Sequence, residues 1–271
     1  MPATSLLEEA KEFVQRHFKE NIAEDFHFHD YQHILNVVES CNHISASYDL
    51  TDEERFVLMF SAWFHDTGYS GGAEDHEMRS AEIAKTFLQE HEVEERIVDQ
   101  VVSAIHSTKM PQRPKNQVEE ILCDADLSHL GRNNYWERCG KLRYEIAVTG
   151  DRIMGDEEWL DFEIQFLNNH NYFTKIGSAL YGKRKRKNLR RLLKQKERVT
   201  RTELDPPEEN VIKKGKNEKK KDPLRELSLG RGVETMYRNA YRTHVNLSAI
   251  ADNKANIMLS VNAIILSIVV S

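Results

Sequence analysis

Apolar residues recur every three or four positions through most of the chain, a period that predicts amphipathic helices. In the first of these segments Leu6, Ala10 and Val14 share one face. No segment of strand length alternates between apolar and polar residues, so we predict an all-α domain over residues 1–197. The expected helices cover about 5–20, 29–48, 51–65, 77–90, 93–107, 118–130, 134–149, 156–169 and 174–196.

Local signals for helix ends support this pattern. Two segments match the capping box, in which a Ser or Thr and a Glu three residues later bond each other's backbone N–H groups. They begin at Ser5 and Thr51. Gly131 is expected to stop the helix before it, and two prolines within residues 110–116 predict a break there.

The composition changes after about residue 197. Residues 198–226 hold charged residues and prolines with few apolar positions, which predicts a solvated, flexible linker. Residues 227–253 are moderately amphipathic, and Ile257–Ser271 carry no charge at all. That last run is shorter than the ~17–25 residues of a membrane-spanning helix. We therefore expect 227–271 to be an amphipathic segment and the start of a longer membrane region, truncated here.

Charge is unevenly distributed over the 271 residues, whose formal net charge is -6. The first two-thirds lean acidic, whereas Lys183–Arg201 and Lys213–Lys221 are dense in cations. Three explanations remain open for these basic runs: a solvated linker, nucleic-acid binding, or a juxtamembrane segment that attracts anionic lipid. No aromatic residues are interleaved for base stacking, which disfavours nucleic acid. The 3 cysteines show no paired metal spacing and fit a reducing cytosol.

The candidate chemistry centres on His65 and Asp66, which end an apolar helix just before Gly68. An imidazole and a carboxylate together suit a divalent cation such as Mn, Fe, Co, Ni or Zn. His33 precedes them, and Asp126 lies in apolar surroundings where an unpaired carboxylate would be costly. Two imidazoles and two carboxylates from three helices would leave open positions for water and substrate, as in catalytic sites. A lone helical histidine is more often a packed or surface residue, so the prediction depends on all four together.

Over about residues 5–195 the chain resembles the HD-domain metal-dependent phosphohydrolases, in particular a branch of small predicted phosphohydrolases. Two motifs depart from the branch, because His76 replaces its usual Asn and Ile146 replaces its usual Tyr. The motifs are Phe28-His29-Asp30-Tyr31-Gln32-His33, Ala62-Trp63-Phe64-His65-Asp66, His76-Glu77-Met78-Arg79-Ser80-Ala81, Asp124-Ala125-Asp126-Leu127-Ser128-His129-Leu130-Gly131 and Leu142-Arg143-Tyr144-Glu145.

This resemblance implies an HD-type helical bundle and a divalent metal cofactor, with Mg also possible. The metal ligands it implies are His33, His65, Asp66 and Asp126, with Asp124 supporting them, and Asp66 also acts in catalysis.

Further site residues are expected around these ligands. Glu77 would position water or act as a base, the alternative being a surface carboxylate. His106 would contact phosphate or hold a second metal, although the branch usually lacks this histidine. Lys109 and Arg143 would neutralise substrate phosphate, and His29 would contact substrate or orient the site. Charged surface residues are common, so a solvated role remains the alternative for both cations.

Residues 235–257, with Leu247-Ser248 and Ala251-Asp252-Asn253-Lys254-Ala255, resemble the start of the membrane-spanning effector domain of bacterial cyclic-pyrimidine (Pycsar) antiphage systems. This resemblance implies a cytoplasmic domain anchored to the inner (plasma) membrane, a role in antiviral defence and assembly into homo-oligomers. The alternative is a long helix that self-associates through its apolar end.

Our first hypothesis is therefore a membrane-tethered, metal-dependent phosphohydrolase that acts on a nucleotide or a cyclic signalling nucleotide. The second is a sensor that binds the nucleotide without cleaving it and gates a membrane effector. The third is a nuclease guided by the basic run, whose activity would fall steeply with salt. Product analysis beside a binding measurement separates the first two.

Overall fold

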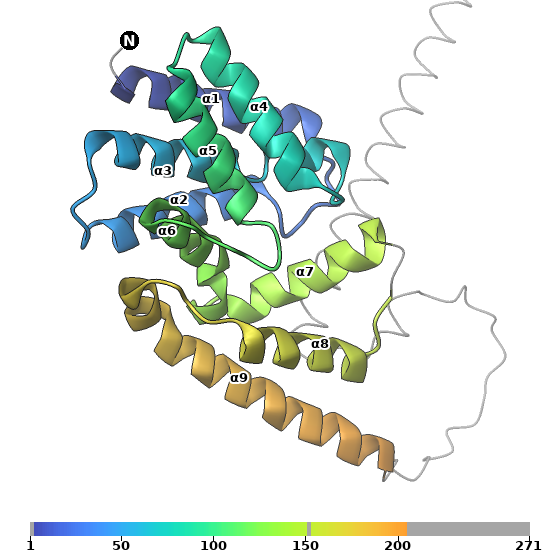
Figure 1. Ribbon diagram of the computed structural model, residues 1–271. Helices are drawn as coiled ribbons and strands as arrows, with labels where there is room; N and C mark the ends of the chain where they lie inside the picture. Colours follow the sequence, from blue (N-terminus) through green and yellow to red (C-terminus); the bar gives the residue numbers. More distant parts are fainter. Residues whose placement is uncertain (1–2, 151–152, 205–271) are drawn as a thin grey trace, which may run out of the picture. The chain divides into compact units, whose positions relative to one another are not determined.

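The helical pattern folds into a helical bundle, seen in the computed structural model of the protein, which describes residues 3–150 and 153–204 (Figure 1). No β-strand occurs in these ranges, which confirms the all-α prediction for the part of the chain described. The elements are α1 (Ala3–Asn21), α2 (Tyr31–Ser45), α3 (Asp52–Phe64), η1 (Thr67–Gly71), α4 (His76–Glu90), α5 (Glu95–Ser107), α6 (Gln117–Asp126), η2 (Leu127–Gly131), α7 (Tyr135–Thr149), α8 (Asp156–Asn169) and α9 (Lys175–Leu204), with η marking 3-10 helices.

Helix α3 lies at the centre of the larger apolar core, where it packs against α1, α2, α5 and α6. Its residues from Phe56 to Phe64 are almost all buried, as expected for a helix covered on every side. The ring of Phe60 stacks on Phe64 at 4.5 Å between centroids, and Phe87 of α4 packs 5.4 Å from Phe64. This packing fixes the C-terminal end of α3, which is where His65 and Asp66 follow.

A smaller apolar cluster joins η2, α7, α8 and α9, with Tyr135, Trp159 and Leu192 among its buried members. The carboxylate of Asp124 in α6 holds the start of α9 by accepting hydrogen bonds from the backbone N–H of Phe173 (2.7 Å) and Thr174 (2.9 Å). Asp124 therefore serves to pack α9 against α6. The sequence had instead led us to expect that Asp124 supports Asp126.

Most predicted helices form, but several of their ends differ. The Thr51 capping box is confirmed, because Thr51 Oγ1 accepts from Glu54 N (3.2 Å) while Glu54 Oε2 accepts from Thr51 N (2.8 Å). The capping box at Ser5 is wrong, because α1 begins at Ala3 and the Ser5 hydroxyl donates to Glu9 within the helix. The helix expected over 118–130 is split into α6 and η2.

Helix α9 runs to Leu204, past the expected end at Lys196 and into the segment predicted as linker. Residues 197–204 lack Gly and Pro and include Glu, Arg and Leu, which favour helix. The rest of the predicted linker to residue 226, and the amphipathic and apolar segment 227–271, lie outside the described residues. None of the helices described is both long enough and apolar enough to cross a bilayer.

Gly68 in η1 sits where no side chain fits. A Cβ atom there would overlap the carbonyl oxygen of His76 and lie 2.7 Å from Ser80 N. We expect Gly68→Ala to lower the free energy of unfolding by about 1–3 kcal/mol, because the backbone of α4 must move away from η1. Urea unfolding followed by circular dichroism measures this loss. Gly182→Ala is the matched control, since a Cβ there meets nothing closer than 3.4 Å, and an equal loss in both variants would contradict the packing argument.

His170, at the end of α8, generates a prediction about pH. Both of its ring nitrogens are buried without a hydrogen-bond partner, and burial, assisted by Lys185, lowers the pKa of His170 to about 4. Between pH 4 and 6.5 the unfolded chain therefore binds more protons than the folded protein. The stability associated with neutral His170 is complete above about pH 6.5 and is lost as pH falls towards 4. Between pH 7.5 and 5 we expect the wild type to lose about 1–2 kcal/mol more stability than His170→Gln in denaturant unfolding. Parallel pH profiles for the two proteins would refute this.

Candidate metal centre

Three helix ends bring His33, His65, Asp66 and Asp126 together. His33 lies in the first turn of α2, His65 caps the C-terminus of α3, and Asp66 follows it. Asp126 is the last residue of α6, which packs against both α2 and α3. The convergence therefore follows from how these three helices share the core around α3.

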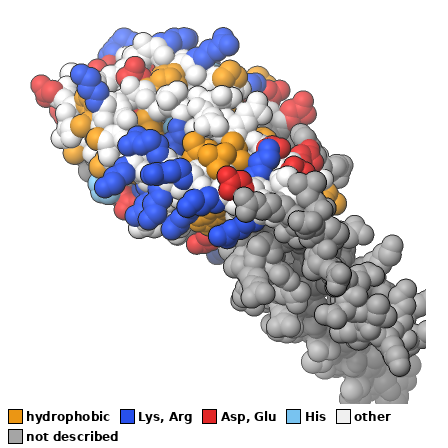
Figure 2. All heavy atoms as spheres, turned by 90° about the horizontal axis from the view of Figure 1, so that it is seen from below, with side chains coloured by type: hydrophobic (Ala, Val, Ile, Leu, Met, Phe, Trp, Pro, Cys, Tyr) orange, Lys and Arg blue, Asp and Glu red, His pale blue; other side chains and the backbone are white. Residues whose placement is uncertain are grey.

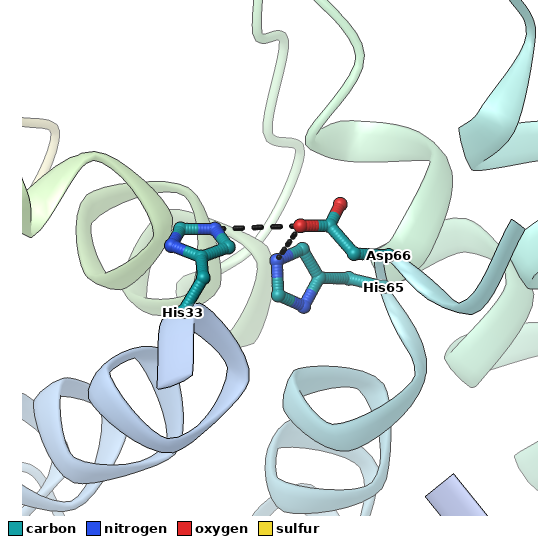
Figure 3. Close-up of side chains that lie close together, drawn as sticks. All are labelled: His33, His65 and Asp66. Atoms are coloured by element: carbon teal, nitrogen blue, oxygen red, sulfur yellow. Dashed lines mark ion pairs between the residues drawn. The ribbon is translucent and has the colours of Figure 1, made fainter. Parts of the chain in front are cut away.

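The distances among these side chains are short. His33 Nε2 lies 3.4 Å from Asp66 Oδ2 and 3.2 Å from Asp126 Oδ1. His65 Nε2 lies 3.2 Å from Asp66 Oδ2 and 3.8 Å from Asp126 Oδ1. Figure 3 shows His33 and His65 pointing their rings toward the Asp66 carboxylate. His33, His65 and Asp66 each offer a ligand atom within 4.8 Å of the others, and all three are buried.

The hydrogen bonds of His65 show that this cluster fits a cation. Its Nδ1 lies 3.0 Å from the carbonyl oxygen of Ala62, which can only accept, so Nδ1 carries the proton. In the neutral ring, Nε2 is then a bare lone pair facing a carboxylate. Both His65 Nε2 and Asp66 Oδ2 are buried and make no hydrogen bond despite their close approach. A divalent cation would satisfy both lone pairs, and a donor set of His nitrogens with carboxylate oxygens suits Mn, Fe, Co, Ni or Zn.

The charged side chains of the cluster shift one another's pKa values. Burial would lower the pKa of His65, but the Asp66 carboxylate, helped by Asp126, outweighs it and raises that pKa to about 9. Burial would raise the pKa of Asp66, but the imidazoles, His65 foremost, hold it well below its usual range. Burial lowers the pKa of His33 despite the neighbouring carboxylates. With no cation bound, a proton on His65 therefore balances part of the negative charge.

Arg138, which the sequence did not single out, positions the helix that carries His33. Its buried guanidinium donates to the carbonyl oxygen of Phe28 and to Asp30 Oδ1 (3.0 Å), and it lies over the Phe28 ring. Asp30 is the N-cap of α2 and accepts from His33 N at 2.8 Å. Arg138 thus holds the first turn of α2 through its cap, from a position 108 residues away in the chain.

His29 lies beside the cluster in a hydrogen-bonded network of its own. Its Nδ1 bonds Glu145 Oε1 and its Nε2 lies 2.9 Å from Tyr69 OH, while the two rings of His29 and Tyr69 stack at 4.0 Å. Glu145 also accepts from the backbone N–H of Phe28 (2.7 Å) and His29 (3.1 Å). His29 therefore lies beside the cluster with both ring nitrogens already bonded to protein groups, a placement that suits the orienting role.

His76 lies between the second oxygen of Asp66 and the carboxylate of Glu77. His76 Nε2 lies 3.6 Å from Asp66 Oδ1 and 3.6 Å from Glu77 Oε1. Its Nδ1 bonds the Ala73 carbonyl oxygen at 2.9 Å, and its ring packs 4.1 Å from Tyr69. Glu77 is buried, so it is not the surface carboxylate that the sequence left open. His76 was named only as a departure from the family motif, and that substitution was the signal pointing to it.

The remaining predicted site residues lie farther from the four-residue cluster. Lys109 is exposed and bonds Asp75 Oδ1 at 2.7 Å, just before His76 in the chain. His106 is exposed on α5 and lines a surface pocket together with Lys109. The guanidinium of Arg143 is buried against Asp156 Oδ1 (2.8 Å) and the Met154 carbonyl oxygen (2.7 Å). These contacts give Arg143 a packing role at α7.

Gln112 is a further neighbour that the sequence did not indicate. Its side-chain amide donates to Asp126 Oδ2 at 3.1 Å from the proline-containing segment between α5 and α6. Asp126 Oδ1 faces the histidines, so Gln112 fixes which oxygen points into the cluster. Lys109 and Gln112 thus place the segment after α5 at the edge of the site.

The geometry predicts a removable cation. Mn²⁺ at a hundred times its dissociation constant should raise the free energy of unfolding by about 2.7 kcal/mol. A chelator should reverse this increase. His65→Gln and Asp66→Asn should each lose the bound metal and the stabilisation, measured by equilibrium dialysis and thermal unfolding. His43→Gln, an exposed histidine of α2, is the control. Metal retained in both cluster variants would rule out this site.

Comparisons with known proteins agree with the geometry. The family model for the HD domain matches residues 30–130, a range that contains all four clustered residues. A crystal structure of a Lactobacillus plantarum protein, solved as a structural genomics target, aligns with a TM-score of 0.54 at 14% identity. The alignment covers 73% of this chain and 98% of that one, and at this identity it supports the fold alone. No curated protein matches the sequence.

HD domains are typically metal-dependent hydrolases and bind divalent metals. Here the matched range and the buried group of His33, His65 and Asp66 coincide. Residues 30–130 of this chain therefore match the HD domain and contain a His/Asp group that could hold a divalent metal.

Proposed function

We propose that this chain is a metal-dependent phosphohydrolase whose substrate is a nucleotide, with cyclic and other signalling nucleotides as the favoured class. The observation that carries the proposal is the pair of buried atoms His65 Nε2 and Asp66 Oδ2, which face each other without a hydrogen bond. Such an arrangement is costly unless a cation or a proton on His65 lies between the two atoms. In the proposal His33, His65, Asp66 and Asp126 hold that cation.

The bound cation would supply Lewis acidity, polarising a phosphoryl oxygen and lowering the pKa of a water molecule. Side chains of this protein would handle the proton and orient the site. The second oxygen of Asp66 faces His76, which also approaches Glu77, so in the proposal these two side chains would hold or accept a proton from water beside the cluster. Glu145 and Tyr69 fix the ring of His29 at the same edge.

A phosphate-bearing substrate is supported by the cations at the rim. Lys109 is exposed and reaches the segment that begins α4, where His76 lies. Exchanging its bond to Asp75 for a bond to a substrate phosphate would cost little, because exposed ion pairs are weak. Arg143 is already engaged with Asp156 and the Met154 carbonyl, so the proposal gives the phosphate-binding role to Lys109 rather than to Arg143.

The proposed setting is the cytoplasmic face of a membrane, in antiphage defence. Support for this part comes only from the sequence of residues 235–271, through its resemblance to cyclic-pyrimidine effectors and its uncharged end. In this setting cyclic pyrimidine nucleotides are the first substrates to test, and homo-oligomers are expected.

The direct test is product analysis. The full chain with Mn²⁺ is incubated with cyclic pyrimidine and purine nucleotides and with nucleoside triphosphates, and products are separated by chromatography. We expect turnover of at least one nucleotide, lost on chelation and reduced at least about a hundredfold in Asp66→Asn. The control Asp49→Asn changes an exposed aspartate between α2 and α3 and should keep full activity.

Two outcomes would contradict the hydrolase proposal. Turnover that survives chelation and Asp66→Asn would mean that another site, or a contaminant, is responsible. Saturable nucleotide binding by calorimetry without any product would favour the sensor that gates a membrane effector.

A further inference from the structure

The solvent face of α9 carries a continuous row of cations. The positions are spaced four, three, four and four residues apart, which keeps side chains on one face of a helix. All five cations in the row are exposed. The opposite face of α9 is buried and carries Tyr181, Asn188 and Leu192. The row consists of Lys183, Lys187, Arg190, Lys194 and Arg198. It extends for about 22 Å, from the rise of 1.5 Å per residue.

Little negative charge interrupts this face. Arg186 and Arg191 are exposed beside the row, and Glu197 is the sole acidic residue between positions 175 and 200. Figure 2 views the molecule from below, the side on which α9 lies in Figure 1, and shows basic side chains gathered there. A surface of this kind concentrates positive potential and attracts an extended anion.

Two apolar side chains stand among these cations. Leu180 is 49% exposed and Leu193 is 43% exposed, each on the solvent side of α9. The one aromatic residue of α9 between positions 175 and 200 is Tyr181, which is buried. Exposed leucines between lysines and arginines suit the interface of a lipid bilayer, where apolar side chains enter below the headgroups. Base stacking on a single-stranded nucleic acid would need exposed aromatic rings instead.

We propose that this cationic face of α9 is a docking surface for an anionic lipid bilayer. The cations would lie against negatively charged headgroups while Leu180 and Leu193 enter the interface, so that α9 lies along the membrane surface. The surface is formed by folded, described residues and is independent of the apolar run at 257–271. It is also independent of hydrolysis, because none of these side chains contributes to the His/Asp cluster.

The test measures how the full chain partitions onto vesicles of phosphatidylcholine, with or without about one-third phosphatidylglycerol, by co-sedimentation. The apolar run at 257–271 is present in every sample, so the difference between the two lipids isolates the electrostatic part. The variant Lys187→Glu, Arg190→Glu, Lys194→Glu reverses the centre of the row. The control Arg16→Glu, Lys19→Glu, Arg55→Glu makes the same charge change at exposed positions of α1 and α3.

We expect the wild type and the control variant to prefer the anionic vesicles, and the α9 variant to lose roughly a hundredfold in partition onto them. Raised salt should weaken the wild-type preference in the same direction. Circular dichroism and Mn²⁺ binding should be unchanged in both variants, which shows that each is folded.

Three results would overturn the proposal. The first is equal partition of the wild type onto both kinds of vesicle. The second is an equal loss in the α9 and control variants, which would reflect net charge alone. The third is a duplex oligonucleotide that binds the wild type more tightly than anionic vesicles do and loses that binding in the α9 variant, which would assign the surface to nucleic acid.

Discussion

The close approach of the Asp66 carboxylate to two buried imidazoles is the interaction on which the site depends. A buried carboxylate must be neutralised, and here the neighbours that face Asp66 Oδ2 are His33 and His65. The Ala62 carbonyl fixes the proton of neutral His65 on the far nitrogen, so the near nitrogen is the one that a cation would bind. Helices α2, α3 and α6 must therefore meet with their ends together. The covered helix α3, with its stacked phenylalanines, keeps those ends in place.

The positioning groups come from parts of the chain far from the residues they hold. Arg138 and Glu145, both on α7, bind the loop before α2, and Gln112 binds Asp126 from the segment after α5. Gly68 lets η1 approach α4 closely, which brings His76 against Asp66. The HD domain matched over residues 30–130 is thus supported by α7, which lies beyond it.

Much of the fold was predictable because nearly every helix is amphipathic and has a polar start or a glycine near its end. The wrong capping box at Ser5 shows the limit, since the helix begins earlier and a local motif cannot show where packing starts it. The adjacency of His65 and Asp66 and the motifs around His33 and Asp126 indicated residues that the structure brings together, while their role as ligands stays a prediction. The roles of Arg138 and Gln112 could not be found, because each acts across a tertiary contact that no local pattern encodes. For His76 the departure from the family motif drew attention to the residue but not to its contact with Asp66.

Locating the ion itself is the most direct test of the metal site. Crystals of the full chain or of its Mn²⁺ complex, measured on both sides of the metal absorption edge, give the position of any bound cation. We predict an anomalous peak among His33 Nε2, His65 Nε2 and the facing oxygens of Asp66 and Asp126. A cluster whose histidines and aspartates bond only to one another at saturating metal, with any peak elsewhere in the molecule, would contradict the central claim.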